Sequence, residues 1–182
     1  LMDNMIIYYA YGIYTNQCSG TSIIGNKIYP GRFGIYLYLE NYYNRSDSVV
    51  VMNNEISDFN DASYQSGLYL SSTYNLRAYH NTINVNATVS SFSYPAMYLS
   101  YPFNHKVFNN NINAVGNSTG LFLAGGTMGS TEIDYNNYFT NNAGLISWQG
   151  TTYNDLGTLK NDITSQNQNS VNEKPGMSGS RN

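Results

Sequence analysis

The sequence is short of charged residues. Asp, Glu, Lys and Arg make up 10% of its 182 residues, whereas about a quarter is usual in globular proteins. The eight Lys and Arg residues form no run or stripe, and the net charge is −3. We therefore expect a surface made polar by Asn, Ser, Thr and Tyr, and no nucleic-acid partner.

Cysteine and long apolar runs are also scarce. The single cysteine, Cys18, excludes an intrachain disulfide and is expected to be a small buried side chain. No apolar run reaches the roughly 18 residues of a membrane helix. No signal peptide precedes the strand-like start at 1–14, and residues 174–182 resemble a cut end. We therefore expect the chain to belong to a larger protein.

What the sequence has in abundance is repetition. One string, as in "AYHNTINV" (78–85), has an apolar residue, two further residues, Asn, any residue, and then Ile or an aromatic residue. A second string, as in "GLYL" (67–70), alternates with the first along the chain. The asparagines of the first string are spaced by 28, 27, 29 and 26 residues and are Asn26, Asn54, Asn81, Asn110 and Asn136.

The second string alternates with period two, which is typical of strands. Leu68 and Leu70 face one way, and Gly67 and Tyr69 face the other. The same alternation in every copy predicts two inward rows. They are Ile13, Ile35, Leu68, Met97, Leu121, Leu145 and Thr15, Leu37, Leu70, Leu99, Leu123, Ser147. Rows that repeat every coil predict a parallel β-solenoid of five to six coils. A leucine-rich-repeat horseshoe is less favoured, because its helical segment is missing.

The recurring asparagine is expected where the strand bends. Asn tolerates left-handed backbone and bonds locally to the main chain. In stacked coils, Asn side chains also bond to one another from coil to coil. The sequence thus predicts an Asn ladder made of the five asparagines given above.

The alternating strings resemble those of right-handed parallel β-helix repeat proteins, the superfamily that includes pectate lyases. This resemblance covers roughly residues 6–147 and is specific for fold rather than for activity. It implies an all-β, right-handed parallel β-helix over 1–150, followed by a C-terminal helix and loop over 151–182.

Residues 133–177 resemble the closing segment of secreted bacterial β-helix proteins. The matching positions are Asp134, Tyr135, Asn136, Tyr138, Trp148, Gly150, Tyr153, Leu156, Ser170, Val171 and Pro175. The second Trp common in such segments is absent, and Leu159 lies nearby. The resemblance implies a short amphipathic helix over 155–166, capped by Asp155 or Asn154. It also implies a secreted or surface protein of Bacteroidetes-like bacteria.

Few residues carry catalytic chemistry. Lys27 with Glu55, and Lys106 with Glu132, are expected to form exposed ion pairs on neighbouring coils. His80 and His105 fall in unrelated rows and are expected to be structural. Glu40, Arg45 and Asp47 share a long loop, where we expect them to be solvated. We assign no catalytic residue.

One weak metal site is considered. Asp58 and Asp61 are close carboxylates that suit calcium together with Asn60 and main-chain carbonyls. A solvated turn is the stronger reading of the same residues. We therefore expect no cofactor, with calcium as the alternative.

The most distinctive predicted surface feature is an outward aromatic row formed by Tyr14, Tyr36, Tyr69, Tyr98 and Phe122, with Ile146 in sixth place. Beside it we expect a glycine row that leaves a shallow groove, formed by Gly12, Gly34, Gly67, Ala96, Gly120 and Gly144. Such rings suit the faces of sugars, but aromatic ladders also stabilise parallel sheets by stacking. Both interpretations stay open at this point.

The sequence therefore predicts a non-catalytic, secreted or cell-surface scaffold that contacts polysaccharide through the aromatic row. One alternative is a fragment of a polysaccharide lyase or glycoside hydrolase. Another is a structural adhesin stalk. Fold analogy alone does not choose among them.

Overall fold

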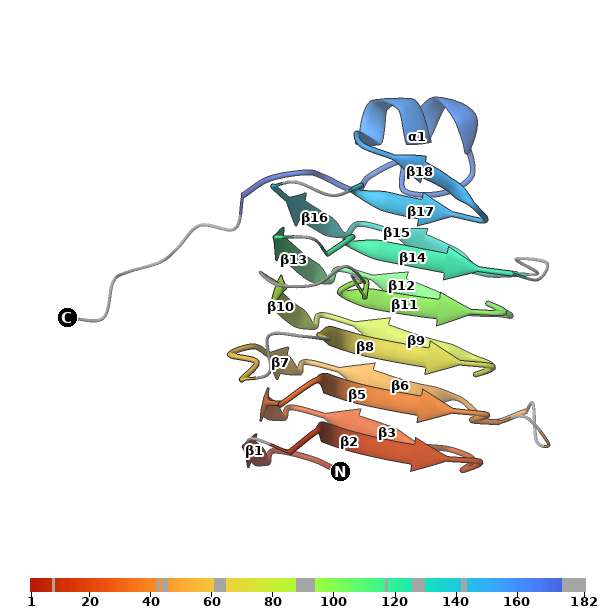
Figure 1. Ribbon diagram of the computed structural model, residues 1–182. Coiled ribbons are helices and arrows are strands. Elements are labelled where there is room, and N and C mark those ends of the chain that lie inside the picture. The colour runs from red at the N-terminus through yellow and green to blue at the C-terminus, as the bar shows by residue number, and fades with distance from the viewer. Residues whose placement is uncertain are drawn as a thin grey trace.

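The structure is a computed structural model. It describes all residues except 8, 42, 44–45, 61–64, 88–93, 117, 126–129, 142–143 and 175–182. The described strands form three sheets that wrap around one interior (Figure 1). The side chains in this interior form one hydrophobic core.

The first sheet has seven strands in the order β18-β17-β14-β11-β8-β5-β2. They are β2 (Tyr11–Asn16), β5 (Phe33–Tyr38), β8 (Ser66–Ser71), β11 (Met97–Ser100), β14 (Leu121–Ala124), β17 (Ile146–Trp148) and β18 (Thr151–Tyr153). All pairings are parallel except that of β17 with β18.

The other two sheets are parallel throughout. The five-stranded sheet contains β3 (Ser22–Ile24), β6 (Val49–Met52), β9 (Leu76–Tyr79), β12 (Lys106–Phe108) and β15 (Glu132–Asp134). The six-stranded sheet contains β1 (Met5–Ile7), β4 (Lys27–Tyr29), β7 (Glu55–Ile56), β10 (Thr82–Ala87), β13 (Asn111–Gly116) and β16 (Asn137–Thr140).

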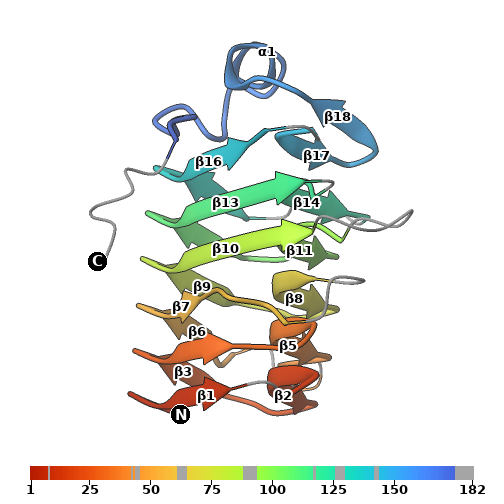
Figure 2. The same ribbon diagram turned by 60° about the vertical axis from the view of Figure 1, so that its left-hand side comes forward.

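Every third strand along the chain returns to the same sheet, so the chain is a parallel β-solenoid, as predicted (Figures 1 and 2). From β2 to β14 it makes four complete turns, with less regular coils before and after them. The sequence predicted five to six coils, so the count differs slightly.

The interior consists of stacked apolar rows. Ile35, Leu68 and Met97 lie in one register row, and all three are fully buried. The rows of the Asn strings are buried as well, from Ile23 to Ile133 and from Ile28 to Tyr138. Burial of a Leu or Ile side chain contributes roughly 1.5–3 kcal/mol, so these rows supply the main stabilisation of the fold.

The predicted register is wrong in the last coil. Leu121 pairs with Ile146 and Leu123 with Trp148, one residue later than the sequence predicted. Trp148 is thereby buried, which removes more apolar surface from water than the predicted inward Ser147. Ser147 consequently lies beside Phe122 in the position that we assigned to Ile146.

Helix α1 (Leu156–Asp162) lies over the C-terminal end of the solenoid (Figure 1). The Asp155 side chain accepts a 2.8 Å bond from the Thr158 amide, which confirms it as the N-cap. Leu156 and Leu159 are buried, and Ile163 packs against the core. The helix is shorter than predicted, because Ile163 already leaves the helical conformation.

The segment after the helix completes the closure of the stack. The Asn167 amide bonds to the Ile133 carbonyl of β15, and the Tyr138 amide of β16 bonds to the Val171 carbonyl. The antiparallel strand β18 covers the edge of the seven-stranded sheet. All three sheets therefore have hydrogen-bond partners at this end.

Candidate functional site

The aromatic row exists as predicted on the seven-stranded sheet, from Tyr14 in β2 to Phe122 in β14. Ring centroids of Tyr36 and Tyr69 are 4.7 Å apart, those of Tyr69 and Tyr98 4.4 Å, and those of Tyr98 and Phe122 5.5 Å. Their planes lie within 15° of parallel. The rings thus stack along the solenoid, one coil upon the next.

Stacking decides which parts of the rings reach solvent. Each middle ring has a neighbouring ring on both faces, so its edge and hydroxyl point away from the sheet. Tyr14 is 51% exposed, and the other four rings are half-buried. Burial, helped by neighbouring phenols, raises the pKa of the Tyr36 and Tyr69 hydroxyls. Both hydroxyls therefore stay protonated at neutral pH.

Further aromatic rings flank the row, and the sequence analysis missed them. The ring plane of Phe33 lies at 88° to that of Tyr36 and at 79° to that of Tyr69. Tyr94 contacts Phe33 and Tyr69, and Tyr11 stacks on Phe33. The alternation of "YGIY" and "FGIY" places an aromatic residue three positions before Tyr14 and Tyr36, a signal that would have identified Tyr11 and Phe33.

The predicted glycine groove is wrong. A Cβ on Gly34 would clash with Cγ2 of Ile56, and one on Gly67 with Cγ2 of Ile83, so both glycines face the interior. The cause is a local bulge: the amides of Gly67 and Leu68 both donate to the Ala96 carbonyl, at 2.9 and 3.0 Å. A bulge breaks the period-two alternation. The aromatic row therefore has no glycine-floored groove beside it.

The Asn ladder is present. The amide and Nδ2 of each asparagine donate to Oδ1 of the asparagine in the next coil, at 2.9–3.1 Å. Asn4 makes the same two bonds to Asn26 and is a further rung that the sequence analysis missed. Its "LMDNMI" matches the string, but the spacing of 22 residues lies outside the others. At the other end, the Asn136 amide donates to Ser170 Oγ.

We expected the ladder asparagine to adopt the left-handed backbone conformation at this corner. That expectation was wrong. The residue before it adopts this conformation, with φ of 56° at Asn53, 55° at His80 and 57° at Asn109. The ladder side chain bonds to backbone groups inside the corner, and this requires the preceding residue to make the sharp turn.

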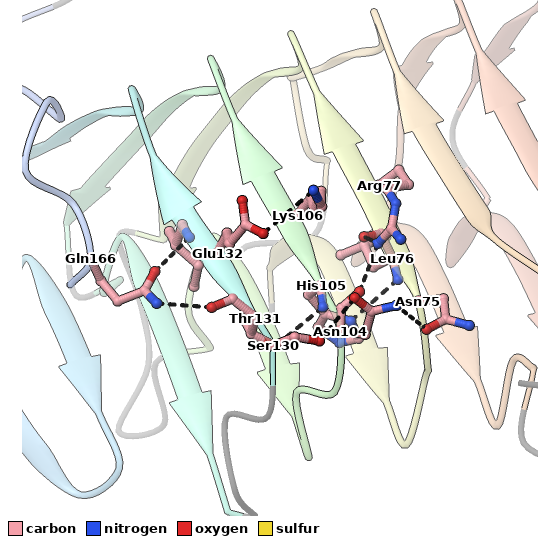
Figure 3. Close-up of polar contacts among 11 residues, drawn as sticks. Asn75, Leu76, Arg77, Asn104, His105, Lys106, Ser130, Thr131, Glu132 and Gln166 are labelled. Atoms are coloured by element: carbon pink, nitrogen blue, oxygen red, sulfur yellow. Dashed lines mark hydrogen bonds and ion pairs between the residues drawn. The ribbon is translucent and has the colours of Figure 1, made fainter.

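A second polar ladder occupies the corner before the five-stranded sheet (Figure 3). Asn104 Nδ2 donates to Asn75 Oδ1 at 2.7 Å, and Ser130 Oγ donates to Asn104 Oδ1 at 3.0 Å. Nearby, the side chain of Arg77 bonds to the Asn104 carbonyl. This cation is therefore engaged by the protein's own backbone.

His105 is structural, as expected, and lies in the interior between Leu76 and Thr131 (Figure 3). Its Nδ1 accepts the Leu76 amide at 3.2 Å, and its own amide donates to Thr131 Oγ1. Burial, together with the charge of Arg77, lowers the pKa of the imidazole to about 3. The ring is therefore neutral at physiological pH.

Two predictions about burial are wrong. Glu40 is not solvated but fully buried, where its oxygens accept bonds from the Cys18 amide and Thr21 Oγ1. These two donors of the preceding coil compensate the carboxylate of Glu40 for its lost hydration. Cys18 itself is exposed rather than buried. Arg45 lies outside the described residues.

The predicted ion pairs are confirmed, at 3.5 Å for Lys27–Glu55 and 3.4 Å for Lys106–Glu132. Both pairs are substantially exposed, and such pairs contribute at most about 1 kcal/mol. Of the candidate calcium residues, Asp58 is exposed with φ of 53°, and Asp61 lies outside the described residues. Among the described residues, no three His, Cys, Asp or Glu side chains gather closely enough to hold a metal ion.

Charge is divided unequally among the three sheets. No Asp, Glu, Lys or Arg occurs in any strand of the seven-stranded sheet. The other two sheets contain Lys27, Glu55, Arg77, Lys106 and Glu132, with Asp134 at the end of β15. The aromatic row therefore lies on the one uncharged sheet.

The family model of the right-handed β-helix region matches residues 1–163. The chain belongs to the right-handed β-helix family. This membership fixes the hand of the solenoid and agrees with the resemblance to the pectate-lyase-like superfamily. No curated protein and no solved structure matches the chain.

Membership in the β-helix family accounts for the recurring strings but assigns no activity to them. The stacked rows and the Asn ladder are features of the β-helix scaffold itself. In the described part of this β-helix, no helix has the length and apolarity to span a bilayer.

Proposed function

We propose that this β-helix is a non-catalytic scaffold, secreted or displayed on a bacterial cell surface, that contacts polysaccharide through the aromatic row. The observation that carries the proposal is the aromatic row itself: half-exposed phenols continue over successive coils of one uncharged sheet. Phenols combine apolar surface with a hydrogen-bonding hydroxyl, as sugar rings require.

The test is a binding screen of the 182-residue chain against plant, algal and host glycans, with and without calcium. A Tyr36→Ala/Tyr69→Ala/Tyr98→Ala variant is measured beside it. Tyr79→Ala is the matched control, because Tyr79 also stacks on a ring, that of Phe108, but on the five-stranded sheet. We expect the triple variant to lose binding and the control to keep it, with circular dichroism establishing that both are folded.

Two outcomes would contradict this proposal. Equal loss of binding in Tyr79→Ala would place the contact elsewhere. Shortening of a bound glycan, followed by size-exclusion chromatography, would replace the non-catalytic role with that of a lyase or hydrolase. Binding that requires calcium would favour the alternative calcium site at Asp58 and Asp61.

A structural stalk is the second candidate, and the close stacking of Tyr69 on Tyr98 favours it. In a stalk, the row serves coil-to-coil cohesion alone. The triple Ala variant would then unfold at a clearly lower temperature, and the parent would bind no glycan in the screen.

A further inference from the structure

We propose that the ligand of the aromatic row is a neutral polysaccharide, held by the tyrosine hydroxyls rather than by ring faces, with its chain running along the direction in which the coils stack. This rests on the proposed function and narrows it to one ligand class and one mode of contact.

The geometry of the rings excludes the usual mode of sugar stacking for the middle of the row. Tyr69 has Tyr36 on one face and Tyr98 on the other, at 4.7 and 4.4 Å between centroids and 14° and 9° between planes. No sugar ring fits between rings this close. A ligand that approaches from solvent meets the outer edge of each phenol, where the hydroxyl is.

The hydroxyls in this arrangement follow the stack of coils, with the Tyr14 ring tilted by 39° against that of Tyr36. Tyr14, Tyr36, Tyr69 and Tyr98 contribute one each, on strands joined in register. Each phenol hydroxyl both donates and accepts hydrogen bonds. The ring centroids of successive tyrosines are 5.5, 4.7 and 4.4 Å apart, close to the spacing of one coil, and the Tyr69 hydroxyl also hydrogen-bonds to that of Tyr98. A polymer with hydroxyl groups along its length therefore makes repeated contacts only when it lies along this line.

The absence of charge on this sheet selects a neutral polymer. The strands of the seven-stranded sheet contain no cationic side chain. A uronate carboxylate placed over these strands would lose hydration without gaining a charged partner from them, the exposed Arg32 lying just before β5. The cations of the strands, Lys27, Arg77 and Lys106, lie on the other two sheets.

Phe122 marks the end of the line and provides a gain-of-function test. It continues the stack, with its ring centroid 5.5 Å from that of Tyr98, but it has no hydroxyl. Phe122→Tyr adds a hydroxyl at the next position of the same line. The change leaves the stacked ring in place.

The experiment is calorimetric titration of the full chain with cellohexaose, mannohexaose and hexagalacturonate. It compares Tyr36→Phe/Tyr69→Phe/Tyr98→Phe with the triple Ala variant, and Tyr79→Phe serves as the control on the five-stranded sheet. The Phe variants keep the rings and the stack, so they separate hydroxyl contacts from ring contacts. Thermal unfolding is recorded for each protein.

We expect at least one neutral hexasaccharide to bind and hexagalacturonate to bind more weakly. The triple Phe variant should bind the neutral sugar roughly tenfold or more weakly, as the loss of three hydrogen bonds predicts, while Tyr79→Phe is unchanged. Phe122→Tyr should tighten binding about two- to tenfold.

Three results would overturn the inference. If the triple Phe variant binds like the parent while the triple Ala variant does not, rings rather than hydroxyls make the contact, and only the proposed function stands. If hexagalacturonate binds more tightly than the neutral hexasaccharides, the ligand is not neutral, and again only the proposed function stands. Failure of the parent to bind any of the three sugars would refute this inference, and the broader glycan screen would then decide on the proposed function separately.

Discussion

At the scale of single residues, the ladder asparagines do work that few other side chains can do. Asn81 donates from its amide and Nδ2 to Asn110, and from Nδ2 to the Val51 carbonyl, while its Oδ1 accepts two bonds from Asn54. Asn81 is buried. Its amide group thus satisfies donors and acceptors of two adjacent coils at a corner without water.

Asn81→Ala should lower the free energy of unfolding by about 3–5 kcal/mol, because several buried groups lose their partners at 1–3 kcal/mol each. Chemical denaturation measures this change. Asn4→Ala is the control: Asn4 is exposed at the first rung, so water replaces its bonds and we expect a loss below about 1 kcal/mol. Equal losses of unfolding free energy at the two positions would show that burial does not strengthen the contribution of a ladder asparagine.

His105 should make the stability of the protein depend on pH. The pKa of the folded imidazole is about 3, whereas that of an unfolded histidine is about 6.5. Between these values the unfolded chain binds a proton that the folded chain does not. Stability is therefore complete above about pH 6.5 and falls as the pH drops toward 3, by up to about 1.4 kcal/mol per unit.

Urea unfolding at a series of pH values from 7 to 4 tests this dependence. The variant His105→Leu, which matches Leu76 in the same inward row, removes the titrating group. We expect its stability to be lower at pH 7, because the Leu76 amide loses its acceptor, but flatter with pH. An unchanged slope in the variant would assign the pH dependence to the carboxylates instead.

At the scale of the strand, the sequence analysis succeeded where period-two alternation is unbroken and failed where it is broken. Leu68, Met97 and Leu121 lie inward as predicted. The predicted direction of Gly67 was wrong, because a bulge shifts the alternation by one residue; the glycine inside the string is its sequence mark, which the analysis read as period two. In the last coil the observed register differs by one residue from the predicted one. The register suggested by the similarity of "GLIS" to the other copies gives way to the register that buries Trp148.

The inward glycines give a prediction for the same strands. Gly34→Ala would place a methyl group against Ile56 and 2.5 Å from the Gly67 carbonyl oxygen. Because that oxygen belongs to the backbone of the next coil, relief requires the coils to shift apart. We expect a loss of about 1–3 kcal/mol, measured as a lower urea midpoint. A neutral effect would indicate that these glycines face solvent after all.

At the scale of the whole molecule, the repeat spacing was enough to predict the solenoid, because only one coil geometry stacks these rows. The exposure of side chains at the corners was not predictable. Glu40 was expected to be solvated and is buried, whereas Cys18 was expected to be buried and is exposed. Both lie at corners, where side-chain direction follows no periodic rule. The candidate site was predicted as a row, but the stacking of its rings depends on side-chain packing that the sequence does not encode visibly.

A solenoid held together by neighbouring coils should open from its ends. The middle strands β8 and β11 have a coil on either side, whereas β2 lies at the edge of its sheet. We expect the slowest amide hydrogen exchange in β8 and β11 and the fastest in β1 and β2, measured by mass spectrometry of peptides. Uniform exchange across the coils would show that the molecule opens as one cooperative unit.

The reversed direction of β18 gives the molecule a polarity. The parallel register of the seven-stranded sheet ends at β17, because its outermost strand β18 runs the opposite way. The segment that contains Asn167 and Val171 closes the neighbouring sheets. The reversal of three residues therefore interrupts the coil-on-coil stacking of the described solenoid at this end.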